Sequence, residues 1–130
     1  MPLVRIDIIE NRRTPDQVKK LADIVQDVMR ETFAAPPRDR YQIITEHKPG
    51  NLIAEDTGLG FTRTDDLVMI QITQQGRDDD NKKALYSTLA ERLKEQTGLS
   101  GDDLIIAVSE NTPADWSFGH GVAQFLEGQL

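Results

Sequence analysis

The sequence predicts an α+β domain of two layers, in which a four-stranded mixed sheet carries two helices on one face. Three observations predict this fold class. Strand-like and helix-like segments follow one another as β-α-β, a link, and β-α-β again. Each expected helix is apolar on one side only, and each expected strand is too hydrophobic to be exposed on both faces. At 130 residues, the chain has the size of one domain.

The first β-α-β unit is expected over residues 2–48 and begins with a strand. Residues 3–9 read LVRIDII, an apolar, β-branched and partly alternating segment that favours strand structure. The unit closes with a second strand in residues 40–48, which read RYQIITEHK.

An amphipathic helix is expected between these two strands. Thr14 is a suitable N-cap, Pro15 suits the first helical position, and Gln17 stands three residues beyond the cap. Apolar residues then recur at helical spacing on one side of the segment. The helix should stop before the Pro36-Pro37 pair, because proline cannot continue a helix.

The second β-α-β unit is expected over residues 66–110, after a turn-rich link at residues 49–65. It consists of a strand, LVMIQITQQ, a helix with acidic residues in its first turn, and a strand, DDLIIAVSE. Gly98 marks the end of the helix. A C-terminal segment, residues 111–130, completes the chain.

The sheet face without helices should also be apolar. We place Val4, Ile43, Met69 and Ile105 on that face, and the chain is too short to supply a third layer that would cover them. Oligomerisation through this face is therefore expected.

Composition narrows the classes of function. The net charge of −7 has the wrong sign for a protein that follows phosphate backbones, so we expect no nucleic-acid partner. No apolar run approaches the roughly 20 residues of a membrane helix, and there is no signal-peptide pattern, which predicts a soluble, cytoplasmic protein without a membrane partner. The chain has no cysteine and only two histidines, which argues against a metal site.

The second residue is the first candidate for chemistry. Methionine is commonly removed when a small residue follows it, so the mature chain should begin at Pro2 with a secondary amine. Such an amine can act as an acid, a base or a nucleophile.

Three further stretches narrow the interpretation. DRYQ at 39–42, EDTGLG at 55–60 and ADWSFGHG at 114–121, together with Pro2 and the repeated β-α-β pattern, resemble the malonate semialdehyde decarboxylase branch of the tautomerase superfamily. The similarity covers essentially the whole chain. It implies a homotrimer whose active sites surround the amino-terminal prolines and require no metal or organic cofactor.

The resemblance also implies site residues. The reactive groups would be Pro2, Asp39 and Arg77. The substrate would be bound by Gln75 and Arg77 and by an apolar wall of Trp116, Phe118, Phe125 and Leu130.

One position departs from the branch pattern, which has two arginines separated by one residue. Here Gln75 replaces the first arginine, and Arg77 is retained as the second. The substitution is expected to affect either the efficiency of decarboxylation or a side activity, such as hydration, that uses both cations. It also removes a positive charge that would lower the pKa of Pro2, so Pro2 is expected to be mostly cationic at pH 7.

The resemblance therefore predicts a carbon-carbon lyase that converts malonate semialdehyde to acetaldehyde and carbon dioxide. Two alternatives stay open. One is a keto-enol tautomerase of a 2-oxo acid, in which neutral Pro2 acts as a general base. The other is a trimeric binding or structural protein without catalytic activity.

Overall fold

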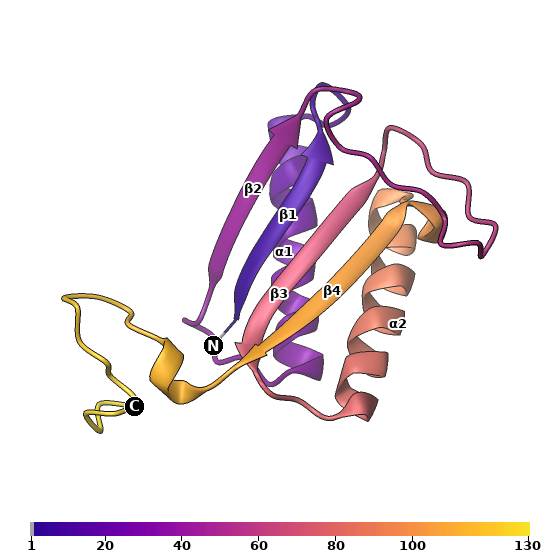
Figure 1. Ribbon diagram of the computed structural model, residues 1–130. Coiled ribbons are helices and arrows are strands. Elements are labelled where there is room, and N and C mark those ends of the chain that lie inside the picture. The colour runs from indigo at the N-terminus through magenta and orange to yellow at the C-terminus, as the bar shows by residue number, and fades with distance from the viewer. Residues whose placement is uncertain (1) are drawn as a thin grey trace.

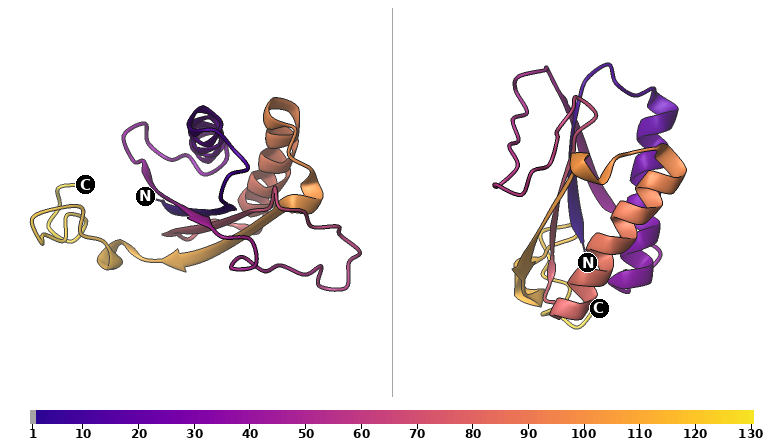
Figure 2. Two further views of the ribbon diagram at one scale, coloured as in Figure 1. Left: turned by 90° about the horizontal axis from the view of Figure 1, so that it is seen from above. Right: turned by 90° about the vertical axis from the view of Figure 1, so that its right-hand side faces the viewer.

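The structure is a computed structural model, and it describes residues 2–130. Its elements in chain order are β1 (Leu3–Ile9), α1 (Pro15–Thr32), β2 (Tyr41–His47), β3 (Val68–Gln75), α2 (Asp79–Thr97), the short 3-10 helix η1 (Gly101–Asp103), β4 (Leu104–Asn111) and the 3-10 helix η2 (Pro113–Asp115). The four strands form one sheet in the order β2-β1-β3-β4. Both helices cover the same face of this sheet, so the fold has two layers (Figures 1 and 2).

The sheet is mixed, as the sequence predicts. β1 pairs with β2 in parallel, β3 pairs with β4 in parallel, and β1 and β3 meet antiparallel at the centre. The Pro2 end is defined here as the end where β1 and β2 begin and β3 and β4 finish. The Arg13 end is the opposite end, where α1 begins and α2 finishes.

The hydrophobic core lies between the sheet and the helices. On β1, the residues at even positions face the helices, and Ile6 and Ile8 are 0% and 1% exposed. Val4 belongs to this set at 1% exposed, so its expected place on the helix-free face is wrong. Strand alternation fixes the assignment, because Val4 shares the face of Ile6 and Ile8.

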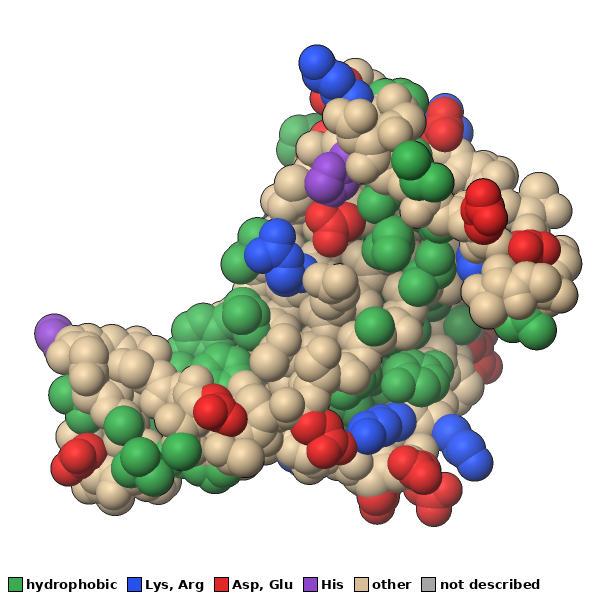
Figure 3. Space-filling model, in the orientation of Figure 1, with side chains coloured by type: hydrophobic (Ala, Val, Ile, Leu, Met, Phe, Trp, Pro, Cys, Tyr) green, Lys and Arg blue, Asp and Glu red, His purple; other side chains and the backbone are tan. Residues whose placement is uncertain are grey.

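The helix-free face carries the remaining strand residues. Ile43 on β2 is 42% exposed, and Met69 and Ile105 pair with each other across β3 and β4 on the same face. Figure 3 looks onto this face and shows hydrophobic side chains over the sheet and on the C-terminal arm. Their placement agrees with the sequence-based expectation for these three residues.

Both helices are capped, and the sequence predicts the N-cap of α1 and the glycine that ends α2. Thr14 Oγ1 accepts a hydrogen bond from the Gln17 amide at 3.2 Å, and Gln17 Oε1 accepts one from the Thr14 amide at 2.9 Å, which completes a capping box. At the beginning of α2, Asp78 Oδ1 accepts a hydrogen bond from the Asn81 amide at 2.7 Å, and Gly98 ends the helix with a left-handed φ of 75°.

The two halves of the chain match at a fixed spacing. Val4 and Val68 occupy equivalent places on β1 and β3, and the N-caps Thr14 and Asp78 are separated by the same 64 positions (4 and 68, 14 and 78). Because β1 and β3 run antiparallel, the repeat places equivalent residues at opposite ends of the sheet. Within residues 2–130, no helix combines the length and apolar character that crossing a membrane requires.

Candidate active site

Pro2 is buried at the beginning of β1. The next residue, Leu3, pairs with Tyr41 on β2 and with Thr73 on β3. The sheet register therefore places Pro2 between the segment that leads into β2 on one side and Gln74 on the other. The expected loss of Met1 concerns a residue outside the described range.

Asp39 stands just before β2, in the segment beside Pro2. Its side chain is half-buried, and its Oδ2 atom is buried without a hydrogen-bond partner among residues 2–130. Its amide donates to the Pro36 carbonyl at 3.0 Å, which fixes the turn. A buried carboxylate oxygen without a donor is costly, so this position is suited to a cationic partner.

Arg40 ties this segment to α1. Its Nη2 donates to Asp23 Oδ1 at 2.8 Å, and its Nε donates to Gln42 Oε1 at 3.0 Å. Hydrogen bonds from Arg40 and then from Lys19 lower the pKa of Asp23 below its ordinary value. These contacts hold Asp39 in place at the Pro2 end.

Arg77 follows β3 at the same end of the sheet, but most of its guanidinium is already engaged. Nε and Nη2 donate to the Phe33 carbonyl at 3.1 and 2.9 Å, and Nη1 donates to the carbonyls of Gln75 and Gly76 at 3.2 and 3.1 Å. Four of its five N–H groups are used, and one N–H of Nη2 has no acceptor among residues 2–130. Arg77 thus joins the end of α1 to the end of β3 and retains limited capacity to bind a ligand.

Two glutamines precede Arg77, and they face opposite sides of the sheet. Gln75 is half-buried on the helix-free face, where it pairs with Asn111 of β4. Gln74 faces the helices and is 0% exposed, and neither its Nε2 nor its Oε1 has a partner among the described residues. Gln74 is therefore a buried amide at the register position opposite Pro2.

Three of the four residues expected to form the wall contact one another in the structure. Trp116 and Phe118 stack with ring centroids 5.3 Å apart, and Phe125 meets Phe118 edge-on at 5.8 Å. Trp116 Nε1 donates to Asn111 Oδ1 at 3.0 Å, which attaches the wall to the end of β4. Leu130, at the end of the arm, is 63% exposed.

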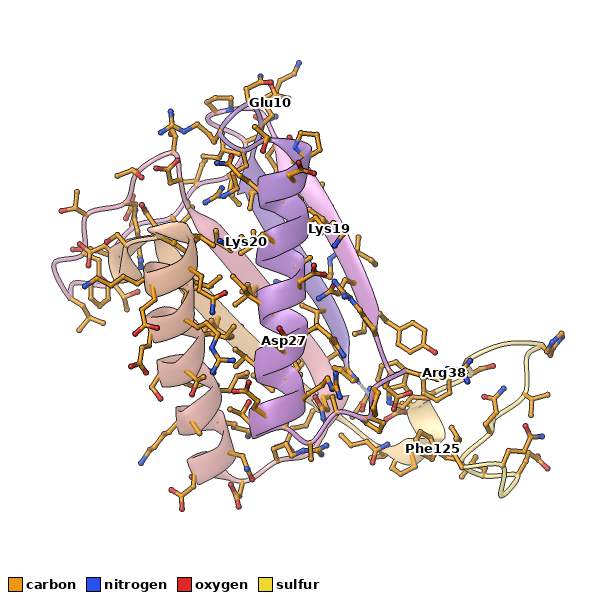
Figure 4. All side chains as sticks on the ribbon, turned by 180° about the vertical axis from the view of Figure 1, so that it is seen from behind. Glu10, Lys19, Lys20, Asp27, Arg38 and Phe125 are labelled. Atoms are coloured by element: carbon orange, nitrogen blue, oxygen red, sulfur yellow. The ribbon has the colours of Figure 1, made fainter. Side chains whose placement is uncertain are left out.

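The wall stands on the C-terminal arm, residues 112–130, which projects from the end of β4 past the Pro2 end (Figure 1). Figure 4 labels Phe125 on this arm and Arg38, which directly precedes Asp39, at the same end of the molecule. The Phe118 amide donates to Gln124 Oε1 at 2.9 Å, so the arm is held by its own hydrogen bonds.

Sequence reasoning missed two residues of this region. Tyr41 extends the wall, because its ring stacks on Phe118 with centroids 5.7 Å apart. Gln74 continues the buried set Val68, Ile70 and Ile72 on β3. The sequence did contain a signal for Gln74, because it is a polar residue at a position where the alternation of the strand predicts a core residue.

Two family models that describe tautomerase enzymes match the chain, one over residues 39–119 and one over residues 2–62. The chain is also 48% identical over 130 residues to "Probable tautomerase YrdN" of Bacillus subtilis (strain 168), with 100% of both chains covered. The chain belongs to the tautomerase family.

Solved structures give this tautomerase-family chain two near neighbours. Crystal structures of malonate semialdehyde decarboxylase match with a TM-score of 0.94 and 40% identity over 98% of each chain. A structure of FG41 malonate semialdehyde decarboxylase inhibited by 3-bromopropiolate matches with a TM-score of 0.92 and 43% identity, over 98% of this chain and 97% of that one. These matches confirm the family resemblance and the fold class.

Proposed function

We propose that this protein is a malonate semialdehyde decarboxylase that uses Pro2 as its reactive group. The observation that carries the proposal is Asp39 Oδ2, which is buried without a hydrogen-bond partner among residues 2–130, in the segment that the sheet register places next to buried Pro2. It supplies a charge partner for a cationic amine at the beginning of the sheet. The similarity of almost the whole chain to two decarboxylases of known structure supports the same reaction.

The protonation state of Pro2 follows from its neighbours. A free α-amino group has a pKa of about 8, and the carboxylate of Asp39 raises the pKa of the Pro2 amine, while burial acts in the opposite direction. Position 75 is glutamine where the branch pattern has arginine, so one positive charge that would lower the pKa of the Pro2 amine is absent. The amine is then largely cationic at pH 7 and can act as an acid.

Decarboxylation breaks the bond between C2 and the carboxylate carbon of the substrate. The electron pair forms a double bond between C2 and the aldehyde carbon, C3, and negative charge develops on the aldehyde oxygen. Cationic Pro2 stabilises this oxygen by donating an N–H. Alternatively, neutral Pro2 condenses with the aldehyde, releases water and forms an iminium that accepts the pair as an enamine. Protonation at C2, followed by hydrolysis in the second route, gives acetaldehyde.

Arg77 orients the substrate carboxylate in this scheme. Its remaining Nη2 N–H and its positive charge attract the carboxylate, while its bonds to the Phe33 carbonyl hold the guanidinium still. The branch pattern would use two arginines here, and Gln75 supplies a neutral amide instead. We therefore expect weaker carboxylate binding and less hydration than an enzyme with both cations would have.

The aromatic wall has a separate role in the proposed reaction. Trp116, Phe118 and Tyr41 form a continuous stack that excludes water from one side of a bound molecule. A carboxylate in such surroundings is poorly solvated, which favours its conversion to neutral carbon dioxide.

A second candidate is keto-enol tautomerisation of a 2-oxo acid, and the relative named as a probable tautomerase favours it. This reaction needs neutral Pro2 as a base, so its rate should fall as pH decreases through 7. A trimer without catalytic activity is the third alternative. It predicts that Pro2, Asp39 and Arg77 are all dispensable.

The deciding experiment measures turnover of malonate semialdehyde and phenylenolpyruvate by the parent, Pro2→Ala and Arg77→Ala proteins. Carbon dioxide release that is lost in both variants, with little loss as pH falls through 7, supports the decarboxylase. Turnover of phenylenolpyruvate alone supports the tautomerase. An intact mass that still includes Met1 would contradict every mechanism that needs the Pro2 amine.

We also propose that the protein assembles as a homotrimer through its helix-free sheet face. Ile43 is 42% exposed there, and an arginine at this position would place a charge in the interface. Sedimentation of Ile43→Arg should show dissociated chains, whereas Ile53→Arg in the loop is the control. A trimeric Ile43→Arg protein would exclude this face as the interface.

A further inference from the structure

A cavity of about 300 Å³ lies at the Arg13 end, between the beginning of α1 and the end of α2. Figure 4 labels Glu10 and Lys20 toward this end, and Arg38 and Phe125 toward the other. The lining residues that matter for its chemistry are Arg12, Arg13, Lys20 and Asp66. The cavity is thus remote from Pro2 and from the aromatic wall.

The lining is cationic, although the protein as a whole is acidic. Three cations face one carboxylate, so the formal charge of these four groups is +2 in a chain of net charge −7. Arg12 Nε donates to Asp66 Oδ1 at 3.0 Å, and Lys20 Nζ donates to the Gln96 carbonyl at 2.7 Å. These contacts fix the positions of both cations and leave positive charge available to an anion.

Arg13 is the least satisfied of the three cations. Its Nη2 donates to the Asp66 carbonyl at 2.7 Å, but its Nη1 is buried without an acceptor among residues 2–130. Burial lowers the pKa of Arg13, and the nearby carboxylates of Asp66 and Asp103 only partly offset this effect. An anion bound beside this guanidinium would compensate the buried charge.

The internal repeat gives this cavity a counterpart. Arg13 and Arg77 are separated by the same 64 positions as the two N-caps, and Asp66 is separated from Pro2 by 64 positions as well (13 and 77, 2 and 66). The Arg13 end therefore keeps the arginine that follows a central strand. At the place that Pro2 occupies in the other half of the repeat, the Arg13 end has Asp66.

We propose that this cavity, the Arg13 cavity, binds a small carboxylate anion and does not transform it. The cavity and its charges carry the proposal, and the analogy with Arg77 rests on the proposed function. A carboxylate group would accept hydrogen bonds from Arg13 and Arg12, and a second carboxylate would lie toward Lys20. The volume is at the lower limit of the range of about 300–1,000 Å³ for small-molecule sites, which suits a compact dicarboxylate.

The test is an amide NMR titration with malonate dianion at constant ionic strength, balanced with sodium chloride. It uses the Pro2→Ala protein as background, so that turnover plays no part. We expect saturable shifts for residues 12–17 and 96–99, and a dissociation constant at least about tenfold higher in Arg13→Gln. Lys20→Gln should weaken binding in the same direction. Lys19→Gln is the matched control, because Lys19 pairs with Asp23 instead of lining the cavity.

Shifts that grow linearly, that sodium chloride alone reproduces, or that persist unchanged in Arg13→Gln would overturn the proposal. If thermal unfolding shows that Arg13→Gln does not fold, Lys20→Gln and Arg12→Gln decide in its place. The result of this titration does not depend on whether the proposed decarboxylation takes place at Pro2. An active Pro2→Ala enzyme would refute the proposed chemistry and leave this binding result intact.

Discussion

The two ends of the sheet are built from one repeat, but the equivalent residues Pro2 and Asp66 at the two ends differ in their chemistry. Each end combines an arginine that follows a central strand with the end of a helix: Arg77 donates to the Phe33 carbonyl just after α1, and Arg13 lines a cavity together with residues 96–98 at the end of α2. The Pro2 end additionally lies at the second residue of the chain, where the expected removal of Met1 would create an amine. At the equivalent place stands Asp66, whose nitrogen belongs to a peptide bond.

This difference explains how a repeated fold can have one reactive end. The repeat duplicates strands, caps and cations, but a chain has one amino terminus. The C-terminal arm adds a second asymmetry, because its aromatic stack lies beside the beginning of β2 and Tyr41 takes part in it. These two features are the basis for proposing catalysis at the Pro2 end and anion binding alone at the Arg13 end.

The largest expected effect on stability comes from a substitution at the centre of the sheet, because the centre supports both ends of the sheet equally. Ile6 pairs with Ile70 in the middle of the β1–β3 ladder and is 0% exposed. Ile6→Ala should reduce the free energy of unfolding by about 2–5 kcal/mol, through lost burial and the cavity left behind. Urea unfolding measures it. Ile53→Ala, at a side chain that is 77% exposed, should stay within about 0.5 kcal/mol of the parent. Equal effects of the two substitutions would contradict the core assignment.

Arg77→Lys should act on the Pro2 end alone. Lysine keeps the charge but cannot reproduce the planar group that bonds the carbonyls of Phe33, Gln75 and Gly76. We expect turnover of malonate semialdehyde to fall about 100-fold, which corresponds to about 2.7 kcal/mol. Arg92→Lys, at an exposed pair with Glu31, is the control. A full loss of turnover in the control would point to general destabilisation instead.

The fold could be predicted from sequence because each element carries its own local signal. Thr14, Pro15 and Gln17 mark the beginning of α1, and Gly98 marks the end of α2. The strand residues alternate strongly enough to reveal β1 and β3. The face of Val4 was wrong because an apolar residue at a strand end fits either face until the register is known.

The site could be predicted only in outline. The resemblance selects Pro2, Asp39 and Arg77, and the structure adds how each of them is held. That Arg77 uses Nε and Nη2 to bond the Phe33 carbonyl could not be read from sequence, because Phe33 is 44 residues away. Stacking of Tyr41 on Phe118 likewise depends on where the C-terminal arm folds.

Gln74→Met should have a smaller effect than Arg77→Lys. The variant removes a buried amide that has no partner among residues 2–130, so protein stability should be unchanged or slightly higher. If the amide contacts the Pro2 amine, turnover should fall about tenfold and the pH profile should shift. Glu10→Gln is the control, because Glu10 holds the equivalent position at the Arg13 end, 64 residues earlier. Unchanged turnover with higher stability would make Gln74 an unpaired core amide without a catalytic role.

The smallest effect concerns the ion pair that holds Asp39 in place. Hydrogen bonds from Arg40 and Lys19 lower the pKa of Asp23 in the folded protein, so its stabilising contribution is present above the unfolded pKa of about 4 and is lost as pH falls through the folded value. Because the pair is exposed, the contribution should be below about 1 kcal/mol. Urea unfolding of parent and Asp23→Asn between pH 7 and pH 2.5 measures it, with Asp27→Asn on the same helix as control. The two curves should converge in acid, and a gap that stays constant with pH would assign the effect of Asp23 to something other than its charge.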